Sequence, residues 1–260
     1  MIIHVEESSK STQVKGVKVI KVQFIHGLES GPSGAKVQHM RQSGFVVIAP
    51  DMQMSVKRLD RHNSVIRNLL RLPEARLATG MSVAGGALLA MGQDRSYARK
   101  AMVLLGGAGV IAGMRHRAWM KQALVRSFEN CVELQEEAIR AHQPDIIVGS
   151  SWGGAVTMEL IRRGAWTGPA ILLAPAYHSV GLRAGWRDLD VREEELRMKS
   201  RSQRIALIHD PTDDVVPYAH SLDLVGHSDI DFKSVSGGGH RLLGYLDDGR
   251  LDSLIKKMVM

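Results

Sequence analysis

The stretch Gly149-Ser150-Ser151-Trp152-Gly153-Gly154 decides the interpretation of this chain. An apolar run at residues 146–148 leads into it, and a helix-compatible stretch at residues 155–163 follows it. A serine in a tight turn between a strand and a helix needs glycine neighbours, because the backbone of the next element passes where their side chains would lie. The stretch therefore predicts a nucleophile elbow, a turn that presents one serine at the carboxyl edge of a sheet. The alternative is an ordinary glycine-rich turn.

Ser151 fits the nucleophile position better than Ser150. Glycines stand two residues before and two residues after Ser151, whereas Val148 occupies the place of the first glycine for Ser150. The amide of Trp152 would open the following helix, and a helix N-terminus stabilises negative charge that develops beside it.

Composition indicates one globular domain over residues 1–260, with 44% apolar and 23% charged residues. The single cysteine, Cys131, excludes an internal disulfide and is typical of a reducing compartment, so we expect a cytoplasmic location. The acidic start has no long apolar run and is unlike a secretory signal. Cys/His pairs at metal-ligand spacing and glycine-rich phosphate loops do not occur in the sequence, so we expect no metal and no cofactor.

The net charge of +7 is concentrated in one segment. Residues 57–126 hold 13 basic and 3 acidic residues, a balance of +10, so the rest of the chain carries 7 − 10 = −3. This segment has no pattern of aromatic residues interleaved with the basic ones, since Tyr97 and Trp119 are its only aromatic residues, and it has no nucleic-acid-binding motif. We therefore expect no nucleic-acid partner.

Further runs rich in Val and Ile predict a series of strands, at residues 16–25, 45–49, 170–174, 205–208 and 230–235. Helix-compatible stretches alternate with them; the first places Val37 and Met40 inward and stops at Gly44. This alternation predicts an α/β fold with a mostly parallel sheet and right-handed crossovers. Every loop that follows a strand then lies at the same edge of the sheet, where active sites form.

The alternation is interrupted before the elbow. Residues 119–142 have the apolar spacing of a crossover helix, but residues 56–117 exceed what a crossover requires and predict an inserted helical hairpin. Its apolar runs, 77–93 and 101–114, would reach roughly 25 and 21 Å as helices, short of the ~30 Å core of a bilayer.

Three interpretations of the hairpin stay open. It forms a lid packed on the body, a segment that dips into or shallowly spans an anionic membrane, or a self-association surface. Small residues at helical spacing, such as Gly86 and Ala90, would allow two helices to approach closely. The basic residues of 57–126 would suit anionic headgroups at the inner face of a membrane, with the protein peripheral or integral. The oligomeric state is left open.

A serine nucleophile needs a base within hydrogen-bond reach, and that base is held by a carboxylate. His240 follows the last predicted strand in a triple-glycine loop, which would let the imidazole lean over Ser151. Asp213 and Asp214 follow the strand at 205–208, and Asp210 lies nearby. An acidic surface turn is the alternative for this loop.

These motifs together resemble the α/β-hydrolase superfamily. The elbow at residues 149–153, the loop His209-Asp210-Pro211-Thr212-Asp213-Asp214-Val215-Val216-Pro217 and the pair Gly239-His240 occur in that superfamily's Ser…Asp…His order. His26-Gly27-Leu28 precedes them, after the first strand. The resemblance covers residues 15–55 and 118–260 and leaves the insertion unexplained.

The resemblance implies a role for each residue that matches the pattern. Ser151 would be the nucleophile, His240 the base and Asp213 the acid, with Asp214 as second choice. The amides of Leu28 and Trp152 would form the oxyanion hole, whereas His26 is interpreted as a structural residue of its loop. Two positions depart from the pattern. Asp210 stands where the family often has glycine and would compete for the histidine, and Glu29 must point away from the oxyanion.

The sequence thus predicts a serine hydrolase that cleaves carboxylic esters or thioesters of small-molecule substrates through an acyl-enzyme. The apolar, Met-bearing insertion favours apolar acyl substrates. Two rivals remain: an acyltransferase that uses the same triad, and a non-catalytic hydrolase-fold protein that binds a membrane or a partner through the basic hairpin.

Overall fold

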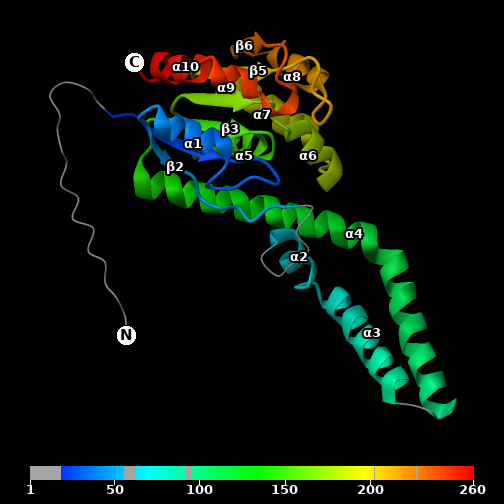
Figure 1. Ribbon diagram of the computed structural model, residues 1–260. Coiled ribbons are helices and arrows are strands. Elements are labelled where there is room, and N and C mark those ends of the chain that lie inside the picture. Colours follow the sequence, from blue (N-terminus) through cyan, green and yellow to red (C-terminus); the bar gives the residue numbers. More distant parts are fainter. Residues whose placement is uncertain (1–18, 56–62, 92–94, 202, 227) are drawn as a thin grey trace, which may run out of the picture.

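Six parallel strands form one sheet at the centre of the chain (Figure 1). The computed structural model describes residues 19–55, 63–91, 95–201, 203–226 and 228–260. The strand order is β2-β1-β3-β4-β5-β6. The strands are β1 (Lys21–Ile25), β2 (Val46–Ile48), β3 (Ile146–Ser150), β4 (Ala170–Leu173), β5 (Ile205–His209) and β6 (Asp231–Ser234). The predicted parallel α/β sheet is confirmed; residues 16–18 of the first predicted strand lie outside the described residues.

Helices cover both faces of the sheet. They are α1 (Ala35–Gln42), α2 (Ser64–Leu69), α3 (Pro73–Met91), α4 (Arg95–His142), α5 (Trp152–Arg162), α6 (Tyr177–Ala184), α7 (Leu189–Ser200), α8 (Tyr218–Val225), α9 (Leu243–Asp247) and α10 (Arg250–Val259). The helix predicted after β1 is confirmed as α1, with Val37 and Met40 buried and Gly44 at φ +87° directly after it.

Two apolar cores lie on opposite faces of the sheet, because successive strand residues point to opposite sides. Ile147 and Leu172 pack with α4, α5, α6, α7 and α8 on one face. Val148 and Ile171 pack with α1, α9 and α10 on the other. The sheet is therefore buried on both faces, and its carboxyl edge is left free for loops.

The crossover helix and the second apolar run form one element. We expected a crossover helix over residues 119–142, separate from the insertion, but α4 runs unbroken through 48 residues, about 72 Å at 1.5 Å per residue. Figure 1 shows that α4 changes direction part-way along its length. No proline lies within it, and its glycines remain helical, so nothing in the sequence ends the helix before the crossover.

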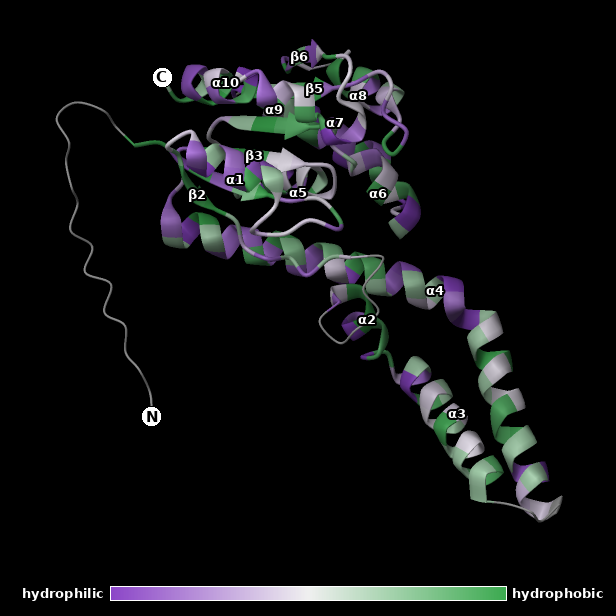
Figure 2. Cartoon of the chain, viewed as in Figure 1, coloured by the Kyte–Doolittle hydropathy of each residue, from purple (hydrophilic) through white to green (hydrophobic). Residues whose placement is uncertain are grey.

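The hairpin, defined here as α3 with residues 95–117 of α4, extends away from the sheet (Figure 1). Small residues form its internal contact: Ala75, Ala78 and Gly85 of α3 are buried, and a Cβ on Gly85 would lie 2.8 Å from Leu105 Cγ. Large apolar side chains of both helices are exposed instead. Figure 2 shows in green the hydrophobic residues that recur along these two helices. Within the described residues, no helix combines the length and the hydropathy needed to cross a bilayer.

Candidate active site

The turn after β3 has the strained geometry of a nucleophile elbow. Ser151 has φ 56° and ψ −116°, a left-handed conformation that side-chain-bearing residues rarely adopt, and α5 begins at the next residue. A Cβ on Gly149 would lie 2.2 Å from Thr157 Oγ1, and one on Gly153 would lie 1.9 Å from the carbonyl oxygen of Ile25. Only glycine fits these two positions. The glycines that flank Ser151 in the sequence are therefore required by the close approach of neighbouring parts of the chain.

The structure brings Ser151, His240 and Asp213 together from three distant loops. His240 Nε2 lies 2.9 Å from Ser151 Oγ, and His240 Nδ1 lies 2.8 Å from Asp213 Oδ2. His240 belongs to a short 3₁₀ turn, Gly239–Arg241, that follows β6, and Asp213 follows β5. These contacts form a continuous hydrogen-bonded relay from hydroxyl to imidazole to carboxylate, in which the carboxylate orients the ring.

The Asp213 carboxylate is fully buried and has four hydrogen-bond donors. The amides of Val215 and Val216 donate to Oδ1, while His240 and His209 donate to Oδ2. Burial raises the pKa of Asp213, but the bonds from Val216 and His240 outweigh it, so the net shift is downward. Asp213 is therefore held as an anion that orients the His240 ring.

His209 is a partner of this carboxylate that sequence reasoning did not identify. Its Nε2 lies 3.0 Å from Asp213 Oδ2, and its Nδ1 lies 2.8 Å from Ser221 Oγ. Burial lowers the pKa of His209, so the ring is neutral, donates from Nε2 and accepts from the Ser221 hydroxyl. The available signal was its position at the end of β5, four residues before Asp213.

Asp210 does not compete for His240, contrary to our expectation. Its Oδ2 accepts hydrogen bonds of 2.8 Å from the amides of Gly238 and Gly239, and its Oδ1 accepts from the amide and the hydroxyl of Thr212. Burial raises the pKa of Asp210, but these four bonds outweigh it and bring the value to about 2. Asp210 thus ties the loop that carries Asp213 to the loop that carries His240.

Three other side chains considered from the sequence lie apart from this relay. Asp214 is exposed. His178 contacts Glu193 of α7. His26 is buried and fixes its own loop, since Nδ1 donates to the carbonyl of Gly27 and Nε2 accepts from the amide of Met52.

The backbone at Leu28 and Trp152 borders Ser151 from two sides. Trp152 is the first residue of α5, and Leu28 lines the same cavity as Ser151. A Cβ on the neighbouring Gly27 would lie 3.1 Å from Ser151 Cβ, so the loop backbone passes directly against the serine. Both amides lack a backbone acceptor among the described residues.

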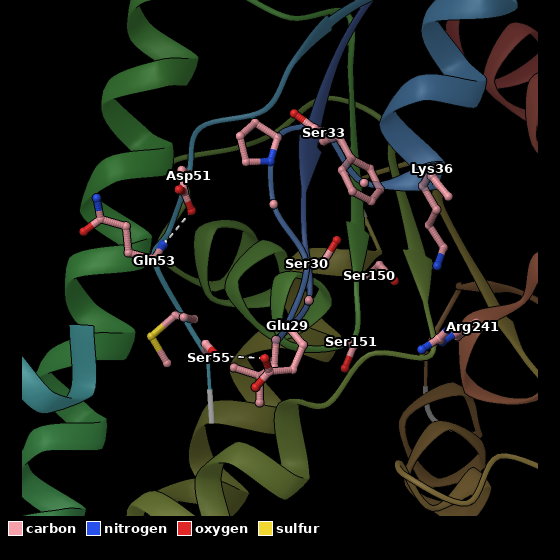
Figure 3. A pocket seen from close by; sticks show the side chains of 18 of the residues that line it. Glu29, Ser30, Ser33, Lys36, Asp51, Gln53, Ser55, Ser150, Ser151 and Arg241 are labelled. Carbon is pink, nitrogen blue, oxygen red and sulfur yellow. Dashed lines mark hydrogen bonds between the residues drawn. The ribbon is translucent and has the colours of Figure 1, made fainter. Parts of the chain in front are cut away.

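A cavity of about 910 Å³ opens beside Ser151 and His240 (Figure 3). Asp51, Ser55 and Glu29 line one side, where Ser55 Oγ donates to Glu29 Oε2 at 2.7 Å. Lys36 and Arg241 line the opposite side. Among the described residues none of α3 or α4 lines this cavity, so the hairpin does not cover it as a lid.

Solved structures with the same architecture provide the comparison. TT1662 from Thermus thermophilus matches with a TM-score of 0.54 at 13% sequence identity, over 93% of this chain and 89% of that one. Est1E from Butyrivibrio proteoclasticus matches with a TM-score of 0.50 at 11% identity, over 92% and 86%. The fold is that of the α/β hydrolases. At these identities the likeness establishes the fold alone, which confirms the predicted fold class.

No protein-family model and no curated protein matches the sequence of this chain.

Proposed function

We propose that the protein is a serine hydrolase that cleaves carboxylic ester or thioester bonds. The observation that carries this proposal is the 2.9 Å contact between Ser151 Oγ and His240 Nε2, backed by the contact of His240 with Asp213. A serine hydroxyl is a weak nucleophile at neutral pH, and an imidazole in this position removes its proton as the oxygen attacks.

The first half of the reaction forms an acyl-enzyme. Ser151 Oγ attacks the substrate carbonyl while His240 Nε2 takes the hydroxyl proton. The amides of Leu28 and Trp152 stabilise the negative charge on the carbonyl oxygen. His240 then donates its proton to the departing alcohol or thiol, and the acyl group remains on Ser151.

The second half releases the acid. Water loses a proton to His240 and attacks the acyl carbonyl, and the proton returns to Ser151 Oγ as the bond to the acid breaks. Asp213 stabilises the charged ring in both halves. In an acyltransferase, an acceptor alcohol or amine would replace water at this step, and product analysis with added acceptors separates the two activities.

Replacement of Ser151 tests the assignment. With a p-nitrophenyl ester as substrate, Ser151→Ala is expected to lower kcat by about 10⁴-fold or more, because no other group replaces the nucleophile. Ser150→Ala is the matched control, since Ser150 ends β3 and the hydrogen bond to His240 comes from Ser151. Loss of activity in the Ser150 variant with full activity in the Ser151 variant would overturn the proposal.

We also propose that the hairpin binds an anionic membrane surface. The supporting observation is its inverted packing, with small residues between the helices and Val83, Met102 and Val103 exposed by 67%, 63% and 73%. Helix pairs in lipid pack in this way, because small residues permit close approach and large apolar residues face the acyl chains. Exposed Arg99, Lys100 and Arg117 would contact anionic headgroups.

A further inference from the structure

Two cationic side chains share the wall of the cavity on the side of His240. Lys36 comes from the first turn of α1, and Arg241 directly follows His240. Figure 3 shows the Lys36 ammonium pointing toward the Arg241 guanidinium. In the part of the chain that the structure describes, neither side chain forms an ion pair. This wall of the cavity therefore carries two positive charges that, among the described residues, form no ion pair with a carboxylate.

Two neighbouring cations are electrostatically unfavourable by themselves, because their charges repel each other. Burial, and to a smaller extent the positive charge of Arg241, lower the pKa of Lys36 to about 8. A carboxylate or phosphate between the two groups would accept charge-assisted hydrogen bonds from both and remove their repulsion.

The opposite wall of the cavity is acidic, and its carboxylates accept hydrogen bonds from neighbouring groups. Glu29 accepts a hydrogen bond from Ser55, and Asp51 Oδ1 accepts one from the amide of Gln53. A negatively charged substrate group would be repelled there. The cavity is thus polarised, and an anion is favoured only on the side of Lys36 and Arg241.

The proton transfer from His240 to the leaving group fixes how the substrate is oriented in this polarised cavity. His240 donates its proton to the leaving group, so the leaving group must lie against His240. Arg241 is the next residue, and Lys36 faces it. The leaving alcohol or thiol, rather than the acyl part, is the portion that these cations reach.

We propose that the leaving group of the substrate carries a carboxylate or phosphate, which Lys36 and Arg241 bind. The inference rests on the proposed hydrolase function and names the substrate class of that site. Hydrolysis adds the water oxygen to the acyl carbon and a proton to the leaving oxygen or sulfur. It therefore releases a carboxylic acid and an anionic alcohol or thiol. Apolar side chains such as Leu28 and Met54 also line the cavity, so an apolar acyl part is compatible with an anionic leaving group.

Matched aryl acetates test this assignment. The anionic substrates are 4-acetoxybenzoate, for a carboxylate, and 4-acetoxyphenyl phosphate, for a phosphate; methyl 4-acetoxybenzoate is the neutral reference. The quantity compared is the ratio of kcat/KM for the anionic ester to kcat/KM for the neutral ester. We expect Lys36→Met and Arg241→Gln each to lower this ratio by about 10- to 100-fold, the loss typical of a hydrogen bond to a charged group. The ester with the larger loss identifies the anion.

Control variants separate this effect from changes in folding or overall charge. Lys257→Met and Arg187→Gln remove exposed cations away from the cavity and should leave the ratio within about twofold of the wild-type value. Lys36→Arg keeps the charge and should retain most of the ratio. Circular dichroism of each variant reports on the fold.

Several outcomes would overturn the inference. A ratio unchanged in the double variant Lys36→Met/Arg241→Gln would remove both residues from substrate binding. A loss confined to the 4-nitrophenyl monoester of adipic acid, whose charge lies on the acyl part, would contradict the assignment to the leaving group. Failure of the proposed function looks different: the wild-type protein would cleave neither charged nor neutral ester, and a fluorophosphonate would leave Ser151 unlabelled.

Discussion

In the sheet-bearing body of the chain the large aliphatic side chains lie inside, whereas in the hairpin they lie outside. Ile147, Leu172 and Ile208 are 0–1% exposed in the strands. Leu89 and Val103, in α3 and α4, are 50% and 73% exposed, and small residues such as Ala78 and Gly85 are buried where these helices meet. The two regions have similar side chains but bury opposite sets of them.

This difference indicates two distinct sources of stability. The body removes apolar surface from water on both faces of its sheet, so its cores stabilise the arrangement of the site loops. The hairpin leaves contiguous apolar surface in water, which is typical of a region that meets another apolar phase or partner.

The largest expected difference is in the response to the same truncation. Leu172→Ala should lower the free energy of unfolding by about 2–5 kcal/mol, because it leaves a cavity in a closed core. Leu89→Ala should lower it by less than about 0.5 kcal/mol, because half of that side chain is already in water. Urea unfolding at neutral pH measures both values, and equal losses would contradict the contrast.

Buried hydrogen bonds also hold the site loops of the body in place, and those of Asp210 are the clearest case. Asp210→Ala leaves the amides of Gly238 and Gly239 without their acceptor. We expect kcat/KM for a p-nitrophenyl ester to fall about 10- to 100-fold, because His240 loses its position relative to Ser151. Full activity in this variant would show that the loop keeps its position without the carboxylate.

The lowered pKa of Asp210 predicts that the stability of the folded protein depends on pH. The pKa of Asp210 in the folded protein is about 2, below its ordinary value of 3.8. Its contribution should therefore be complete above about pH 4 and be lost as the pH falls toward 2, because unfolding then takes up a proton. The difference in unfolding free energy between wild type and Asp210→Asn should shrink over that range. A difference independent of pH would contradict the assignment.

Membrane binding tests the outward face of the hairpin. The triple variant Val83→Ser/Val103→Ser/Val110→Ser should reduce partitioning onto vesicles with anionic lipid by about tenfold or more, because the apolar area available to the bilayer falls. Val191→Ser/Leu182→Ser, two exposed apolar residues of the body, is the matched control. Retention in the supernatant with anionic vesicles at low salt would reject the membrane proposal, and a dimer in light scattering would favour self-association.

The smallest expected effects concern two neighbouring glycines of α3. Gly86→Ala should stabilise the protein by roughly 0.5–1 kcal/mol, since the position is open and alanine favours helix. Gly85→Ala should show less gain or a loss, because its Cβ would lie 2.8 Å from Leu105 Cγ. Thermal unfolding of the two variants measures the difference, and equal gains would show that the helices are not in close contact there.

Much of the fold was predictable because its signals are local. The strand-to-helix elbow requires glycine at residues 149 and 153 for steric reasons, and the apolar runs of β3, β4 and β5 follow from burial on both faces. The order of Ser151, Asp213 and His240 along the chain then placed three candidate side chains at one edge of the sheet.

Other features depend on contacts that no local pattern encodes. The backbone amides that donate to Asp210 lie 28 and 29 residues away along the chain. The sequence position of Asp210 therefore suggested competition with Asp213 rather than a link between the two loops. The second donor to Asp213, His209, depends on side-chain orientation after β5. The continuity of α4 across the insertion results from the absence of a helix-ending residue, which periodicity alone does not reveal.

Covalent labelling with a fluorophosphonate tests the central claim most directly, because only an activated serine reacts. We expect one molecule of probe per chain, located on Ser151 by mass spectrometry, with labelling at least about 100-fold slower in His240→Ala. An unlabelled protein, a probe on another residue, or equally fast labelling without His240 would contradict the account.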